Sequence, residues 1–297
     1  MYYGAVFEAK KEIPAKRRFV LASANRRTTL AVISSVTLLA TLVHGANPSN
    51  GVLHLQVNRH GCKEPGEGVY SVLAASARDK AVAYFADMGF VVQKQDVVRK
   101  VEVFCTRESA RKALTAEFHA SEADIPATFS GTVQNATLFV VSKEIYKENF
   151  TQLYGAESWK DEEYEKLMTQ EMIHSAHAIV AKQLFGTEDG MGPQWLFEGM
   201  AIEASGQLPT NDAELAKITT DDFDGFLQKA EKGSLAAPVY VQYAKFYRYV
   251  RQFVSSKWIV ENAGRPDVID RIRQAVRGST LSPKTGDRMG HPRFWLV

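Results

Sequence analysis

The pattern of apolar and polar positions predicts helices over most of the chain. In a helix, apolar side chains return every three or four positions, and several long segments have this period. Glycine and proline clusters at 190–193 and 264–266 separate helices in the second half. The segments with helical period are 70–88, 107–118, 160–185, 194–205, 240–261 and 267–276.

Two short segments have the composition of strands instead. Residues 101–105 and 136–142 are rich in β-branched and aromatic side chains, and strand patterns are absent after about residue 156. We therefore expect an α+β fold. A small mixed region with a short sheet would occupy 46–155, and a mostly helical region would occupy 156–297.

Residues 1–45 have the pattern of a targeting segment. Residues 1–27 contain seven lysines and arginines but two glutamates, and the next segment, 28–43, reads TTLAVISSVTLLATLV without a charge. This order predicts a signal peptide cleaved after Gly45. The alternatives are an uncleaved membrane anchor formed by 28–43 and a buried helix. Either targeting form predicts an exported protein, which is periplasmic, secreted or anchored to the membrane.

The composition is that of a folded protein and excludes some functions. The chain is 45% apolar, and its 36 lysines and arginines nearly balance 34 aspartates and glutamates, for a net charge of +2. This balance argues against a nucleic-acid partner, which usually requires a clear basic excess. The two cysteines are Cys62 and Cys105. Export would permit a disulfide between them, and two free buried thiols are the equal alternative.

The helix predicted for 160–185 has chemically active side chains beside its apolar face. At about 100° per residue, His174 and His177 lie within roughly 40° of the direction of Gln170, and Glu171 lies about 100° away. Metal-competent groups therefore border a stripe that packs in the core. The apolar face is formed by Met172, Ile173, Ala176, Ile179 and Val180.

The next predicted helix contains a carboxylate in an apolar context. Glu198 is surrounded by large apolar side chains in the sequence WLFEGMA. A glutamate is not expected in such surroundings unless it is paired, protonated or bound to a metal.

The two helices together resemble a known family. QEMIH at 170–174, followed by Glu198 in PQWLFEGMA, resembles the gluzincin zinc metallopeptidases, which have an HExxH helix and then a helix with a glutamate ligand, often as WLxEGxA. The strand pattern ATLFVVS at 136–142 and the segment YVQYAKFYRYV at 240–250 resemble the family's flanking sheet and downstream helix. The resemblance covers roughly residues 100–280.

The resemblance implies a set of roles for individual residues. Glu171 would be the general base, His174 the second histidine ligand of a zinc ion, and Glu198 its carboxylate ligand. A tyrosine of the later helix, Tyr243 or with less support Tyr240, would stabilise the oxyanion. Tyrosines at this spacing are also the stripe that any packed helix shows, so packing is the alternative for both.

The chain departs from the family at the first ligand. Gln170 occupies the position of the first histidine, and an amide oxygen is a much poorer zinc ligand than an imidazole. The leading expectation is therefore a pseudopeptidase, in which zinc binding is weak or lost and the fold binds a peptide or protein partner. A site formed by His174, His177 and Glu198 would instead give an active peptidase with an unusual ligand set.

Other interpretations have less support in the sequence. His174 would be a satisfied core histidine if the match were a coincidence, and the protein would then be a peptide- or protein-binding module without metal. Sequences typical of other enzymes, such as GxSxG, GxxxxGK[ST], GxGxxG and CxxC, are absent.

Overall fold

The computed structural model describes residues 55–63, 67–119, 121–122 and 125–280. The predicted targeting segment therefore lies outside the described residues. Among the helices that are described, none combines the length and the apolar character needed to cross a membrane.

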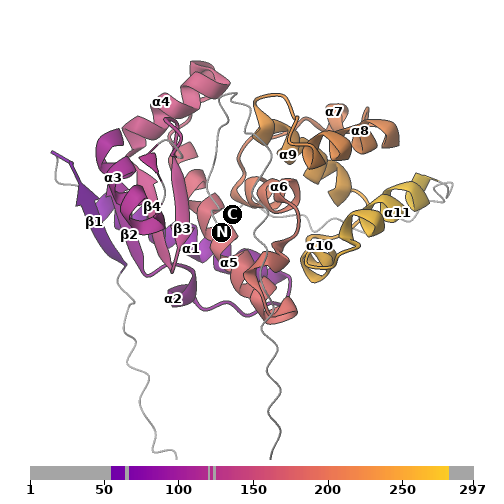
Figure 1. Ribbon diagram of the computed structural model, residues 1–297, viewed down its shortest axis with the longest axis horizontal. Helices are drawn as coiled ribbons and strands as arrows, with labels where there is room; N and C mark the ends of the chain where they lie inside the picture. The colour runs from indigo at the N-terminus through magenta and orange to yellow at the C-terminus, as the bar shows by residue number, and fades with distance from the viewer. Residues whose placement is uncertain (1–54, 64–66, 120, 123–124, 281–297) are drawn as a thin grey trace, which may run out of the picture. The chain divides into compact units, whose positions relative to one another are not determined.

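A sheet of four strands forms the first part of the described chain (Figure 1). Its strands are β1 (Gln56–His60), β2 (Lys100–Phe104), β3 (Gly131–Gln134) and β4 (Thr137–Val141). Their order is β1-β2-β4-β3, and β1, β2 and β4 are parallel while β3 is antiparallel to β4. The edge strand β3 is thus joined to β4 by a tight hairpin. The sequence predicted β2 and β4, but not the two edge strands.

Helices cover both faces of the sheet. The register aligns Arg59, Val103, Val140 and Gly131 across the four strands, so their side-chain positions share one face. On this face lie α1 (Glu67–Asp87), which contacts β1, and α5 (Glu163–Phe185), which contacts β3. The opposite face packs against α3 (Arg107–Phe118). The sheet therefore supports α5 from one side.

Helices make up the remainder of the described chain, which confirms the α+β expectation. Apolar residues from the sheet and from the later helices join in one buried cluster, so the core is continuous across the two parts. The remaining elements are α2 (Lys94–Val97), α4 (Lys143–Tyr154), η2 (Ala156–Ser158), η3 (Glu188–Met191), α6 (Gln194–Ser205), α7 (Asp212–Leu215), α8 (Thr220–Glu231), α9 (Val239–Arg251), α10 (Ser256–Asn262) and α11 (Val268–Thr280).

The prediction of one helix over 240–261 is wrong at its middle. Helix α9 ends at Arg251 and α10 begins at Ser256. The Ser255 hydroxyl accepts a hydrogen bond from the Trp258 backbone N–H at 3.1 Å, which caps the new helix. Arg251 donates to the Val254 carbonyl at 2.8 Å and closes the turn. Apolar residues continue through the break, and for this reason the period alone did not reveal it.

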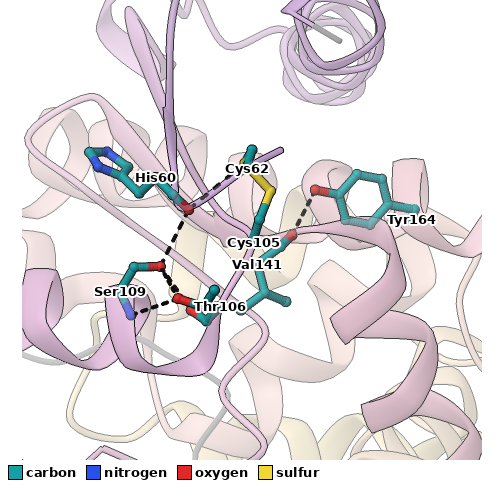
Figure 2. The surroundings of a disulfide bond; sticks show 7 residues. All are labelled: His60, Cys62, Cys105, Thr106, Ser109, Val141 and Tyr164. Atoms are coloured by element: carbon teal, nitrogen blue, oxygen red, sulfur yellow. Dashed lines mark hydrogen bonds between the residues drawn. A yellow bond between two sulfur atoms is a disulfide. The ribbon is translucent and has the colours of Figure 1, made fainter. Parts of the chain in front are cut away.

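A disulfide joins Cys62 and Cys105 just beyond the ends of β1 and β2 (Figure 2). The Cys105 backbone N–H also donates to the His60 carbonyl at 2.9 Å. At the neighbouring strand end, the Tyr164 hydroxyl of α5 donates to the Val141 carbonyl of β4 at 2.7 Å. The structure thus decides between the two alternatives for the cysteines, and it fastens β1 and α5 to the same end of the sheet.

Candidate functional site

The structure brings His174 and Glu198 into direct contact. Nε2 of His174, on α5, lies 3.1 Å from Oε2 of Glu198, on α6. The chain returns between the two helices through η3 and Gly192-Pro193, and α6 begins at the next residue. Side chains 24 positions apart in the sequence therefore face each other.

A glycine lets α6 lie close enough to its other neighbour, α9. A Cβ atom on Gly199 would lie 2.4 Å from Cβ of Tyr247 and 2.7 Å from the Tyr243 carbonyl oxygen. No other residue fits this contact without a shift of one helix. The glycine that follows Glu198 thus has a packing role, and it keeps the tyrosines of α9 beside the carboxylate.

Glu171 lies next to this pair and is held between α5 and the edge strand. Its Cγ is 3.1 Å from the position that a Cβ on Gly131 would occupy, so the missing side chain in β3 makes room for it. Burial raises the pKa of Glu171 to about 7, the charge of His174 opposes this effect, and the charge of Glu198 adds to it. A carboxyl group with this pKa exchanges a proton near neutral pH.

Electrostatic effects on His174 act in opposite directions. Burial lowers its pKa, but the carboxylates of Glu198 and Glu171 raise it more, so the net pKa lies above the ordinary value. Its ring also packs edge-on against Phe197, with ring centroids 5.6 Å apart. His174 and Glu198 therefore form a buried pair in which the carboxylate favours the protonated imidazole.

Gln170 lies one helical turn before His174 and is as deeply buried. As whole residues, Gln170, Glu171, His174 and Glu198 are each at most 7% exposed. Gln170 lines a small cavity together with Tyr240. Gln170 takes no part in the contact between His174 and Glu198.

His177 faces a different part of the molecule. Its ring packs against Phe85 of α1, with ring centroids 5.9 Å apart, and neither ring nitrogen has a hydrogen-bond partner in the described part of the chain. Burial, together with the charge of His174, lowers the pKa of His177 to about 3, so the imidazole is neutral. It sits between α1 and α5 rather than in the contact with Glu198.

The charges of Glu198 and Glu171 act on Tyr240, one of the two candidate tyrosines. Burial raises the pKa of Tyr240 well above its usual range, and the charges of Glu198 and Glu171 raise it further. Tyr243 packs edge-on against the Tyr240 ring, with centroids 5.8 Å apart. The choice of Tyr243 over Tyr240 as the oxyanion-stabilising residue stays a prediction.

The donor set fits two of the three protein positions of a zinc site. Two atoms bound to one tetrahedral zinc lie about 3.4 Å apart, within a few tenths of an ångström of the 3.1 Å between His174 and Glu198. The resemblance would give the third position to Gln170, whose amide is a neutral and weak donor. Within the described residues, no group of three or more histidine, cysteine, aspartate and glutamate side chains is placed to hold a metal ion.

A groove opens beside His174 along the edge of the sheet. It has a volume of about 560 Å³, and its walls are residues 132–136 of the β3–β4 hairpin and the second half of α5 from His174 to Gln183. Since β3 is an edge strand, it has backbone groups available beyond its pairing with β4. The sequence did not reveal this groove, because a four-residue strand with Gly131 carries little periodic signal.

Comparison with known proteins found no match for the chain. The chain matches no known protein family, no curated protein and no solved structure.

Proposed function

We propose that this protein is an exported, gluzincin-like metallopeptidase-fold protein with a degenerate zinc site, a pseudopeptidase that binds a peptide or protein partner. The observation that carries the proposal is the contact between His174 and Glu198. These residues come from the two separate motifs on which the resemblance rests, QEMIH and WLFEGMA. A coincidental match would have no reason to place them 3.1 Å apart in the core.

The amide of Gln170 supports the loss of catalysis. The neighbouring residues retain the chemical types that a zinc peptidase needs, with Glu171 beside the pair as a carboxyl group of pKa about 7. The amide supplies neither the basicity nor the affinity of an imidazole. With two strong donors instead of three, the site does not hold zinc firmly enough for peptide hydrolysis.

Binding is supported by the groove beside the edge strand. An extended peptide adds to an exposed sheet edge through backbone hydrogen bonds, while pockets next to the strand accept its side chains. The groove offers both, with β3 on one wall and α5 on the other. Capture of a peptide there requires no metal.

The disulfide supports the export part of the proposal. Structural disulfides persist in oxidising compartments and are rare in the cytosol. The bond between Cys62 and Cys105 therefore agrees with a targeting segment in residues 1–45.

The second candidate is an active zinc peptidase with an unusual ligand set. The pKa of Glu171, near neutrality, favours it, because a general base works best when its pKa is close to the working pH. This candidate and the pseudopeptidase differ in whether the natural protein turns over peptides.

Peptide cleavage and peptide binding should be measured on the same preparations, with zinc added and with a chelator. We expect the natural protein to retain peptides from a random library without cleaving them, whether or not zinc is present. The Gln170→His variant should gain chelator-sensitive cleavage, and the double variant Gln170→His, Glu171→Gln should lose it again. Chelator-sensitive turnover by the natural protein would refute the pseudopeptidase and favour the second candidate.

A further inference from the structure

A cavity of about 30 Å³ lies beside Gln170, apart from the groove along β3. Its walls come from α4, the segment before β3, α5, the turn after α6 and the start of α9. Five parts of the chain that are distant in sequence therefore meet around one amide. Among the residues that line it are Tyr146, Tyr154, Leu167, Gln207, Leu208 and Tyr240.

The cavity has no charged side chain in its lining. The lining consists of aromatic, aliphatic, amide and hydroxyl residues, so an ionised group that entered would have no partner of opposite charge. The nearby carboxyl groups Glu171 and Glu198, whose charges act on Tyr240, would also repel an anion. The cavity therefore favours a neutral group over a carboxylate.

Two amides supply polar recognition inside this neutral lining. Gln170 is 5% exposed, and it lines the cavity. The side-chain N–H of Gln207 donates to the Tyr146 hydroxyl at 3.4 Å, which is a long hydrogen bond. This bond does not use the side-chain oxygen of Gln207. An amide offers both a donor and an acceptor, and another carboxamide satisfies both at once, whereas a carboxylate only accepts.

Hydrogen bonds hold the walls in place. Asn149 donates to the Phe129 carbonyl at 3.0 Å and to Ser130 Oγ at 3.2 Å, which fixes the segment that leads into β3. Arg248 of α9 donates to the Gln207 carbonyl at 2.9 Å and to the Leu208 carbonyl, which fixes the turn after α6. The cavity is thus a preformed part of the fold.

The size of the cavity limits what can enter. One water needs roughly 10–15 Å³ of such volume, so the cavity holds about two or three groups of that size. The end of a short side chain fits, and an aromatic ring does not.

We propose that this cavity is a subsite for a carboxamide, the end of an asparagine or glutamine side chain in a bound peptide, with Gln170 as the residue that recognises it. The inference rests on the proposed function in taking a peptide as the ligand. It gives Gln170 a role of its own, recognition of an amide, at the position where the metallopeptidases carry a histidine ligand.

The test uses propionamide, propionate and two acetylated, amidated amino acids, those of asparagine and aspartate, added to the full-length protein. Binding is followed by NMR titration of the methyl and amide signals. We expect propionamide and the asparagine compound to bind at least about tenfold more tightly than the carboxylates, as the loss of one or two hydrogen bonds predicts.

Variants separate recognition by Gln170 from general binding. Gln170→Met keeps the volume and removes the amide, and it should abolish the tenfold preference. Gln207→Met should also weaken propionamide binding and reduce the preference for propionamide over propionate. This variant replaces Gln170→Met if Gln170→Met does not fold. Gln228→Leu alters an exposed amide on α8 outside the cavity and should change nothing.

Three results would each overturn the proposal. They are equal affinity for propionamide and propionate, no saturable binding of either compound, and a preference for propionamide that survives in Gln170→Met. Binding of propionamide without any preference for the asparagine compound over the aspartate compound would overturn its assignment to a peptide side chain. None of these measurements involves zinc or cleavage. A failure here is therefore distinguishable from a failure of the proposed function.

Discussion

Gly199 allows α6 to pack directly against α9. Because a Cβ there would lie 2.4 Å from Cβ of Tyr247, Gly199→Ala forces the helices apart and should lower the free energy of unfolding by about 1–3 kcal/mol or more. Urea denaturation measures the change.

Gly225 of α8 provides the matched control. A Cβ added there meets nothing within 4 Å. Gly225→Ala should therefore stabilise the protein by about 0.5–1 kcal/mol, the usual gain in a helix interior. Equal effects at the two glycines would show that α6 and α9 are not in close contact.

Glu171 should make stability depend on pH in a predictable direction. Burial raises its pKa to about 7, so between pH 4.5 and 7 the folded protein keeps a proton that the unfolded chain releases. Stability attributable to this group therefore falls as the pH rises through that window. Glu171→Gln stays neutral, and it should match the natural protein near pH 4 but exceed its stability by up to about 3 kcal/mol at pH 8.

Glu165 on the same helix should behave in the opposite way. Partial burial raises its pKa, but hydrogen bonds from Lys80 and Ser76 outweigh this and leave the pKa below its usual value. Glu165→Gln should therefore reduce stability at pH 8 and have little effect at low pH, where the carboxylate is protonated. Urea denaturation at several pH values tests both variants, and a pH-independent difference for Glu171→Gln would contradict the assigned pKa.

At the level of elements, the sequence predicted the helices that have a strong apolar period and missed the short edge strands. The ranges 107–118 and 194–205 are helices in the structure with the predicted bounds, because their apolar stripes span whole turns. The edge strands β1 and β3 have four or five residues and mostly half-exposed side chains, so they lack a clear alternation. The prediction of one continuous helix over 240–261 was wrong because Ser255 caps a new helix within an apolar run.

The disulfide should stabilise the sheet at its β1 edge. It closes a loop of 43 residues, for which loss of chain entropy in the unfolded state predicts roughly 4 kcal/mol. The double variant Cys62→Ser, Cys105→Ser should lower the free energy of unfolding by about 2–4 kcal/mol. Reduction of the natural protein should have the same effect and should not affect the double variant further.

If reduction and the double variant left the unfolding transition unchanged, the bond would not be present in the folded protein. Mass spectrometry of peptides from an unreduced digest would identify the pairing directly.

For the molecule as a whole, the sequence offered candidate site residues but not their arrangement in space. Glu171, His174 and Glu198 were identified from two short motifs, and the structure places them together. His177 shares their helix face in projection but packs against Phe85, because a neighbouring helix covers that part of α5. The cavity beside Gln170 depends on five distant segments, so no local pattern could predict it.

The central claim is that His174 and Glu198 are two ligands of a zinc site that Gln170 has disabled. Zinc content by elemental analysis tests it most directly, on the natural protein, on Gln170→His, and on the double variants that add His174→Ala or His177→Leu to it. The account predicts less than stoichiometric zinc in the natural protein and about one zinc in Gln170→His. That zinc should be lost with His174→Ala and kept with His177→Leu. One zinc in the natural protein, or none in Gln170→His, would contradict the account.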